Sequence, residues 1–276
     1  MRIAQLRVTH TEIVESIKIV TINTWKCDGD YRVRMQILAG QLEALNPAII
    51  TCQECFYSDE GKADTLKFLA DKLTMHYTFL EGRFKKRLFE GKWVDSFSGL
   101  GILSAYPLNS FKKFNLPEVP GDEDRKAQQV EITLPTEGKI LITNTHLTHI
   151  NNIQARKAQA EALADIVNAN ETVSYSVICG DFNAVHGSIE ISAFMNKSGA
   201  IDCYAAGNGT EPRYSLADAF AKNKRICVDH IFALPMAGGN AYPRFINSEI
   251  VLNVADEVTR FYPSDHFGIS TQLVID

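Results

Sequence analysis

The strongest constraint on the fold of this chain is a series of eight short apolar runs rich in β-branched residues. Runs of this length and composition are typical of buried β-strands. They occupy residues 17–22, 48–52, 97–104, 128–134, 139–145, 174–179, 228–234 and 267–274. The fold must therefore contain at least one large β-sheet.

Helical patterns separate some of these runs. Four apolar residues recur at helical spacing before Asn46-Pro47, which ends the helix: Met35, Leu38, Leu42 and Leu45. A second stripe, with Asn151 or Asn152 as its N-cap, consists of Ile153, Ala160, Leu163 and Val167. Segments 62–73 and 188–197 predict two shorter helices.

The connections between strands are of two kinds. The runs 128–134 and 139–145 flank the turn sequence PTEG and predict a hairpin, whereas helices connect other runs. Strands joined in both ways imply a mixed sheet or two packed sheets of the α/β class. The chain has no internal repeat and no linker rich in Pro, Gly or Ser, so one domain over residues 1–276 is the simplest organisation.

Composition excludes several classes of protein. The 276 residues are 45% hydrophobic and 22% charged, which excludes a disordered or collagen-like chain. There are 28 Lys and Arg against 33 Asp and Glu, a net charge of -5. This balance disfavours nucleic-acid binding by general neutralisation of phosphates but leaves a local basic patch open.

The sequence also predicts the compartment. No stretch approaches the roughly 20 apolar residues of a membrane span. The first residues lack the apolar core of a signal peptide and carry Glu12 and Glu15 in its place, so we expect a cytoplasmic protein. Cys52 and Cys55 form a CxxC without a second such pair, and we interpret them as structural thiols.

Polar residues stand where the strand runs end or begin. Four runs are followed by such residues, and two are preceded by them; in chain order they are Asn23, Glu54, His146 and Asp181, then Asp229 and Asp265-His266. If the first four strands run toward one edge and the last two run away from it, all of these groups meet at one pole of the sheets.

Such a meeting point has a definite chemistry. Buried carboxylates and imidazoles cost several kcal/mol unless they bind one another or a cation. Oxygen ligands suit Mg²⁺ or Mn²⁺, and His146 and His266 suit proton transfer or charge stabilisation. The set predicts metal-assisted hydrolysis of a phosphate ester. Taken singly each signal has a structural explanation; for example, Asp181 and Asn183 in GDFN fit a tight turn.

The ordered set resembles the endonuclease/exonuclease/phosphatase superfamily, which includes DNase I-like nucleases, neutral sphingomyelinases and inositol-polyphosphate 5-phosphatases. The resemblance runs over nearly the whole chain through TINTW, CQE, NTHL, GDFNA, VDHIF and SDHFGI. It implies a four-layer α/β sandwich of the DNase I type, with two mixed central β-sheets flanked by helices and the site at one end.

The resemblance also implies roles for the residues. Glu54 is the expected principal metal ligand, with Asn23 and Asp265 contributing directly or through water. Asp229 is expected to orient His266, which acts either as a general base or as a stabiliser of phosphoryl charge.

Three further residues receive roles in the same way. Asp181 is expected to position or activate the nucleophile or to protonate the leaving oxygen. Asn183 and His146 are expected to donate hydrogen bonds to the phosphoryl oxygens.

The sequence departs from the family pattern at two positions. Ala105 stands where members often have Arg, and Arg125 is a candidate to supply that charge. His230 follows Asp229 where many members have an aromatic residue. On a strand it points away from Asp229, so we do not count it as catalytic.

Several basic and aromatic residues remain outside the motifs. Segment 81–95 is basic and aromatic, and it fits either a loop that binds nucleic acid or lipid headgroups or a solvated hairpin whose aromatics pack on the sheet, which we favour. His149 and His186 lie near the predicted site in sequence, whereas His10 and His76 have no partner motif.

The predicted function is that of a phosphoesterase that acts on a small molecule, a lipid headgroup or a nucleic acid. No protein partner is implied. The alternative is a non-catalytic member of the same fold that binds a phosphorylated ligand.

Overall fold

The computed structural model describes residues 16–135, 138–169, 173–208, 213–236 and 241–275. Glu12, Glu15 and His10 lie outside this part of the chain, and the expectation about a signal peptide is therefore not tested by it. The two middle residues of the PTEG turn also lie outside it.

Two mixed β-sheets form the centre of the molecule. One has the strand order β12-β13-β1-β2-β5-β4, with β3 paired to β2, and the other has the order β10-β11-β9-β8-β7-β6. The strands of the first sheet are β1 (Ser16–Asn23), β2 (Ile49–Ser58), β3 (Ala63–Asp64), β4 (His76–Phe89), β5 (Lys92–Ser104), β12 (Phe245–Val251) and β13 (Gly268–Val274). Those of the second are β6 (Leu108–Asn115), β7 (Lys126–Thr133), β8 (Lys139–His146), β9 (Tyr175–Asp181), β10 (Ile201–Asp202) and β11 (Asp229–Ala233).

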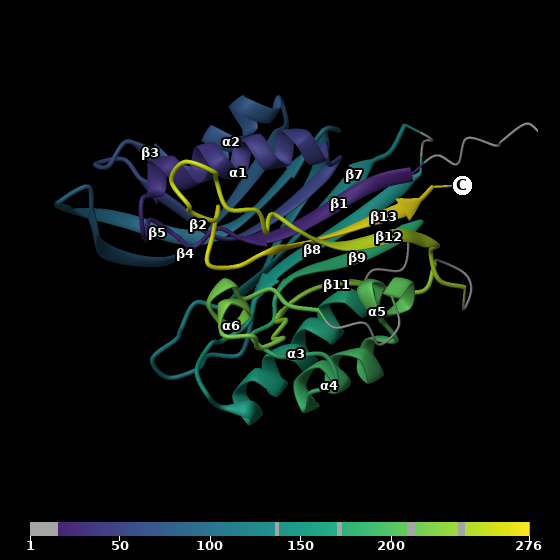
Figure 1. The fold of residues 1–276 in the computed structure, drawn as a ribbon. Helices are drawn as coiled ribbons and strands as arrows, with labels where there is room; N and C mark the ends of the chain where they lie inside the picture. Colours follow the sequence, from purple (N-terminus) through teal and green to yellow (C-terminus); the bar gives the residue numbers. More distant parts are fainter. Residues whose placement is uncertain (1–15, 136–137, 170–172, 209–212, 237–240, 276) are drawn as a thin grey trace, which may run out of the picture.

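Helices cover the outer face of each sheet. The helices are α1 (Tyr31–Leu45), α2 (Thr65–Leu73), α3 (Ile153–Asn168), α4 (Ile189–Ser198), α5 (Cys203–Asn208) and α6 (Ala217–Ala221). In Figure 1, α1 and α2 lie on one side of the strands and α3 and α4 on the other. This arrangement confirms the predicted four-layer α/β sandwich.

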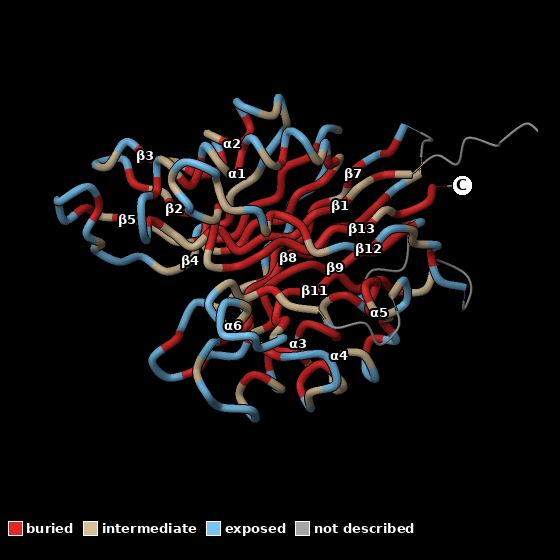
Figure 2. The backbone as a smooth tube through the Cα atoms, viewed as in Figure 1, coloured by how far each residue is buried: buried red, intermediate tan, exposed pale blue. Residues whose placement is uncertain are grey.

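Three buried clusters hold the layers together, and Figure 2 shows the buried backbone running through the centre. Ile19 and Ile49 meet Ile142 and Val177 between the two sheets. A second cluster joins α1 and α2 to the first sheet, and a third joins α3 and α4 to the second sheet. Burial of apolar area is the main stabilising contribution in each cluster.

The helix ends follow local sequence signals. Asp30 caps α1 by accepting a hydrogen bond from Val33 N, and Asn46 ends this helix in the left-handed conformation just before Pro47. Of the two N-caps considered for the second stripe, Asn152 is the one that caps α3.

Three long strands were missed by the search for apolar runs: β4, β6 and β12. Each lies at the edge of its sheet, so a single neighbour covers its backbone, and polar residues interrupt its apolar ones. The basic segment 81–95 lies in the hairpin of β4 and β5 and is not a loop. Its aromatics are divided, because Phe89 is buried whereas Phe84 and Trp93 are exposed.

The six cysteines are buried and free. Cys52 and Cys55 pack in the cluster under α1 and α2, in agreement with their interpretation as structural thiols. Among the described residues, no helix has the length and apolar character needed to cross a membrane.

Candidate active site

The directions of the strands bring the motif residues to one pole. In the first sheet β1 and β2 are parallel, so that Asn23 pairs with Gln53, and β13 is antiparallel to β1 and begins just after Asp265 and His266. In the second sheet parallel β8 and β9 pair His146 with Asp181, and antiparallel β11 pairs Asp229 with Asp181. The polar residues of the two sheets therefore face each other at this end.

A buried acid and imidazole group forms one half of the site. His266 Nδ1 lies 2.8 Å from Asp229 Oδ2, and because the carboxylate accepts, Nδ1 is the donor. Ligand atoms of Asp181, Asp229 and His266 all lie within 4.8 Å of one another. Asp229 Oδ1 is buried and has no hydrogen-bond partner among the residues that the structure describes. Asp181, Asp229 and His266 are all more than 120 positions from Asn23 and Glu54 in the sequence, so only tertiary structure brings the two halves together.

One oxygen of Asp181 lies at the centre of this half. Asp181 Oδ2 accepts a hydrogen bond of 3.1 Å from Asn23 Nδ2 and lies 3.4 Å from His146 Nε2 and 3.9 Å from His266 Nε2. The other oxygen, Oδ1, accepts from Asn183 N at 2.8 Å, and Asn183 is in the left-handed conformation. GDFN is thus both a tight turn and part of the cluster. Asp181 Oδ1 accepts the hydrogen bond of the turn, whereas Asp181 Oδ2 faces the cluster.

Burial and neighbouring charges shift the protonation of these groups in opposite directions. Burial, and then the charge of Asp229, raise the pKa of Asp181 to about 7. Burial opposes protonation of His266, but Asp229 and Asp181 outweigh it and raise its pKa to about 10. Burial, with Arg125 and His266 nearby, holds the pKa of His146 well below its usual range. At neutral pH His266 is therefore cationic and His146 neutral.

A more open half of the site faces the first sheet. Glu54 sits in a bulge of β2 with a left-handed backbone, and its side chain is 19% exposed. Lys26 Nζ donates to Glu54 Oε2 at 2.7 Å and lies 3.5 Å from Asp28 Oδ2. Although burial lowers the pKa of Lys26, the Glu54 carboxylate outweighs it and raises the pKa. Burial and Glu54 both raise the pKa of Asp265.

The backbone of this open half is held by one buried arginine. Arg34 on α1 is 2% exposed, and its guanidinium stacks 4.7 Å from the Trp25 ring. Its nitrogens donate to the carbonyl oxygens of Thr24, Trp25, Lys26, Asp28 and Pro263. Ser264 Oγ adds a bond to Asn23 O at 2.6 Å. The loops that carry Lys26 and Asp265 are thus fixed to each other.

The oxygen donors of the open half fit a hard divalent cation. Glu54 and Asp265 are like charges close enough to raise the pKa of Asp265, an arrangement that a cation relieves. The amide oxygen of Asn23 accepts from Trp25 N at 3.0 Å and supplies a third oxygen to this region. Carboxylate and amide oxygens without thiolates are the donors that Mg²⁺ and Mn²⁺ prefer.

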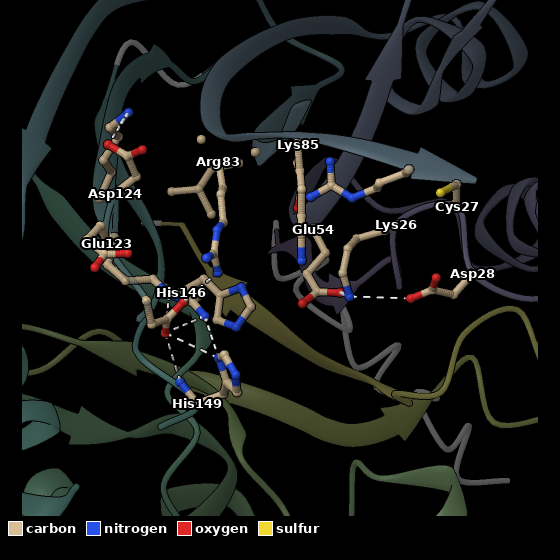
Figure 3. Close-up of a pocket in the computed structure, with 18 of the residues that line it drawn as sticks. Lys26, Cys27, Asp28, Glu54, Arg83, Lys85, Glu123, Asp124, His146 and His149 are labelled. Carbon is tan, nitrogen blue, oxygen red and sulfur yellow. Dashed lines mark hydrogen bonds and ion pairs between the residues drawn. The ribbon is translucent and has the colours of Figure 1, made fainter. Parts of the chain in front are cut away.

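A cleft of ≈ 620 Å³ opens beside both halves, with Glu54 and His146 in its lining. Figure 3 shows Arg83 and Lys85 extending from β4 into this cleft, toward the side where Glu54 and His146 lie. Seven of its lining residues are Lys or Arg and five are acidic, so a basic surface exists within a chain of net charge -5.

Two other candidates from the sequence also line the cleft. Arg125 binds Asp122 at 2.8 Å and lies 3.1 Å from His149 Nδ1. Arg125 thus supplies positive charge near His146, as its place in the sequence suggested.

The remaining histidine candidates lie elsewhere. His186 Nδ1 is 3.0 Å from Asp202 Oδ2 and is not part of the cleft lining. His230 is buried, with Nε2 2.8 Å from Ala184 O and Nδ1 3.6 Å from Asp202, so its ring faces away from the cluster.

Sequence reasoning missed Lys26 and Arg34. Lys26 lies three residues after Asn23, but no rule of spacing shows that its ammonium reaches Glu54. Arg34 occupies an apolar stripe position of α1, and a charged residue at such a position was the available signal.

Comparison with solved structures shows the same fold at low sequence identity. An endonuclease/exonuclease/phosphatase from Beutenbergia cavernae has a TM-score of 0.76 and 19% identity over 94% of this chain and 72% of that chain. The human Nocturnin catalytic domain, solved with a bound sulfate anion, has a TM-score of 0.70 and 17% identity over 95% and 94%. A mannosyl-6-phosphatase from Bacteroides thetaiotaomicron has a TM-score of 0.68 and 19% identity over 94% and 100%.

Sequence comparison gives the family. A search among curated protein sequences gives no match. A sequence model of the Endonuclease/Exonuclease/phosphatase family matches residues 20–266, a range that contains each of the motif residues from Asn23 to His266. The chain belongs to the endonuclease/exonuclease/phosphatase family.

Proposed function

We propose that this protein is a hydrolase of phosphate mono- or diesters that depends on Mg²⁺ or Mn²⁺. Membership of the family supports phosphoester hydrolysis. A sugar phosphatase and a domain solved with sulfate, an oxyanion shaped like phosphate, are among the structural neighbours. A cytoplasmic location stays a prediction from the sequence.

The observation that carries the proposal is the convergence of Asp181, Asp229 and His266 within 4.8 Å, with Asp181 only 3.4 Å from His146, which lines the cleft together with Glu54. A binding module needs cations and amides for a phosphate, but it has no use for a carboxylate that orients an imidazole. Two carboxylates with one cationic imidazole form a set that handles protons.

Asp181 is the proposed general base and acid. Its pKa is raised to about 7, so both protonation states are populated near neutral pH. Water attacks phosphorus and gives a proton to Asp181 while the new P–O bond forms and the bond to the leaving oxygen breaks. The proton then passes to the leaving oxygen, which restores the carboxylate.

His266 is the proposed stabiliser of phosphoryl charge. Since Asp229 fixes a proton on Nδ1 and the pKa is raised to about 10, Nε2–H is also a donor at neutral pH. This favours charge stabilisation over the alternative role of general base. A fixed cationic donor that faces the phosphoryl oxygens stabilises the transition state without reorganisation.

Asn183 and neutral His146 are proposed to bind the same oxygens. Asn183 Nδ2 lies 3.1 Å from His146 Nε2 and donates to Leu147 O at 3.0 Å, which fixes the amide beside the imidazole. Glu54, Asp265 and Asn23 are proposed to hold the metal ion. When bound, the ion supplies positive charge that polarises the phosphate and offsets the charge of the leaving oxygen.

The direct test is hydrolysis of bis-p-nitrophenyl phosphate and p-nitrophenyl phosphate with Mg²⁺, with Mn²⁺ and with a chelator. We expect activity with the metals that the chelator abolishes. Hydrolysis that persists in the chelator would remove the metal from the proposal. If neither compound nor a broad phosphoester panel is hydrolysed, the non-catalytic binding alternative is favoured.

A further inference from the structure

Strand β4 places three basic residues on one face. The pairing of β4 with β5 is unbroken from Arg83 opposite Ser98 to Phe89 opposite Lys92. Because side chains alternate along a strand, Arg83, Lys85 and Arg87 point to the same side, with about 6.8 Å between successive members. All three line the cleft that also contains Glu54 and His146. We call these three residues the β4 wall.

Most of the other cations of the cleft are paired with carboxylates. Lys26 binds Glu54, Arg125 binds Asp122 at 2.8 Å, and Lys86 lies 3.2 Å from Asp95. Lys126 lies 3.8 Å from Asp124 and donates to the Glu81 carbonyl. These groups are largely neutralised within the protein.

The β4 wall is different. Arg83 lies 3.8 Å from Asp122, a carboxylate that already binds Arg125 more closely. In the part of the chain that the structure describes, neither Lys85 nor Arg87 forms an ion pair. The side chain of Arg87 donates to Ser96 Oγ at 2.8 Å, and burial lowers its pKa. Lys85 is exposed to the cleft and Arg87 is only partly buried, so both retain positive charge that is free to receive an anion.

The position of the wall indicates that this anion is part of a molecule bound in the cleft. The cleft that the wall lines is also lined by His146, whose Nε2 lies 3.4 Å from Asp181 Oδ2, and its volume of ≈ 620 Å³ lies within the usual size range of small-molecule sites. A molecule whose scissile phosphate lies at Asp181 and His266 therefore extends past the wall. We propose that the β4 wall is a subsite for a second phosphate of the same substrate, and that the protein acts on doubly phosphorylated molecules. The inference rests on the proposed function for the identity of the first phosphate.

The second phosphate can belong to two kinds of substrate. One is a small bisphosphate, and the other is a single-stranded nucleic acid, in which the next phosphate of the backbone would bind the wall. Leu88 and Trp93 form a cross-strand pair at the cleft and are 57% and 69% exposed. An exposed ring that lines the same cleft as these cations also accepts a stacked base. The wall is common to both kinds of substrate, and the experiment separates them.

The first experiment compares two chromogenic substrates, thymidine 5′-(p-nitrophenyl phosphate) with and without a 3′-phosphate. Both release p-nitrophenolate, and they differ by one phosphate. We expect the 3′-phosphate to raise kcat/KM by about 10-fold, since one charge-assisted contact has about this effect. Lys85→Ala should abolish this advantage, while Lys92→Ala, an exposed charge on the same hairpin outside the cleft lining, should keep it. An advantage that survives in Lys85→Ala overturns the proposal, and so does its absence in the natural protein when neither pair of the binding experiment below shows a gain.

The second experiment does not require turnover, so it separates failure of this inference from failure of the proposed function. Titration calorimetry in a chelator compares fructose 1,6-bisphosphate with fructose 6-phosphate, and 5′-phosphorylated dithymidylate, which has two phosphates, with thymidine 5′-phosphate. We expect the second phosphate to tighten binding by about 10-fold in at least one pair, and Lys85→Ala to remove the gain. A gain in the sugar pair indicates a small bisphosphate, and a gain in the nucleotide pair alone indicates a nucleic acid. No gain in either pair overturns the proposal.

Discussion

The two halves of the site pole differ in how their charges are satisfied. On the side of the second sheet, Asp181 and Asp229 are each 1% exposed and are joined to His266 by short contacts. On the side of the first sheet, the side chains of Glu54 and Lys26 are 19% and 28% exposed and face the cleft. The first group is buried and joined by internal hydrogen bonds that leave only Asp229 Oδ1 unpartnered among its described carboxylate oxygens, whereas the second is open to solvent and to ligands.

This difference separates two tasks. A buried group with fixed hydrogen bonds holds protons at defined atoms and needs no further partner. Partly exposed carboxylates near one another retain free lone pairs that bind a cation which exchanges with solvent. The buried half should therefore control proton transfer, and the open half should control metal affinity.

The largest expected effect is on the buried half. His266→Ala should lower kcat by about 1,000-fold, because it removes a cationic donor and leaves Asp229 without its partner. The metal concentration that gives half of the maximal rate should not change. Steady-state kinetics over a Mg²⁺ titration measures both quantities, and His76→Ala, an exposed histidine of β4, is the control. A shift in the metal dependence would break the separation between the halves.

A smaller loss of activity, which depends on the metal concentration, is expected for a substitution in the open half. Glu54→Gln should lower the rate by about 100-fold at low metal concentration, and added Mg²⁺ or Mn²⁺ should restore part of it because a weaker ligand remains. The same titration measures this, with the exposed Glu118→Gln as the control. If excess metal restores nothing, Glu54 acts in some other way than as a ligand.

The open half also depends on Arg34 for its shape. Arg34→Met should lower the free energy of unfolding by about 3 kcal/mol, because five backbone carbonyl oxygens lose a donor in a buried place. Urea unfolding followed by circular dichroism measures the change. Arg32→Ala on the same helix removes a half-exposed pair with Glu90 and should change stability by less than about 0.5 kcal/mol. Equal effects of the two variants would contradict the role of Arg34.

The smallest expected effect is a change with pH in the stability of the folded protein, caused by titration of groups in the buried half. The pKa of His266 is raised to about 10, above the value of about 6.5 for free histidine, so the folded protein keeps a proton that the unfolded chain releases. The stabilisation is full below about pH 6.5 and is lost as the pH rises through 10. Burial raises the pKa of Asp181 to about 7, which acts in the same direction between about pH 4 and 7.

Thermal unfolding of the protein in a chelator should therefore show a Tm that falls from pH 7 to pH 10. In His266→Gln the fall should be shallower, since the titrating group is gone. If the curves of Tm against pH are parallel for the natural protein and His266→Gln, groups other than His266 determine the pH dependence of stability between pH 7 and pH 10.

Much of the layered fold followed from local patterns. The runs at 17–22 and 139–145 became β1 and β8, and the stripes before Asn46 and after Asn152 became α1 and α3. The edge strands β4, β6 and β12 escaped because an edge strand needs no continuous apolar run. Their existence depends on a neighbour that is distant in sequence.

The sequence predicted which residues form the candidate site better than it predicted the contacts between them. Residues at strand ends, such as Asn23 and Asp181, had to lie at a sheet edge, and the direction of the strands brought these edges together. The partner of each group was not predictable. These partnerships depend on distances between separate strands. Examples are the contact of Asp181 Oδ2 with His146 and His266 and the ion pair of Lys26 with Glu54.

The sequence by itself determined the strand and helix periods, the family motifs and the residue types that a phosphate site needs, because these are properties of neighbours along the chain. Tertiary structure alone decided which charges neutralise one another and which, like Lys85 and Arg87, form no ion pair with any described residue. The reason is physical: an ion pair depends on the separation of two charges in space and on their burial, and neither quantity is encoded in their spacing along the chain.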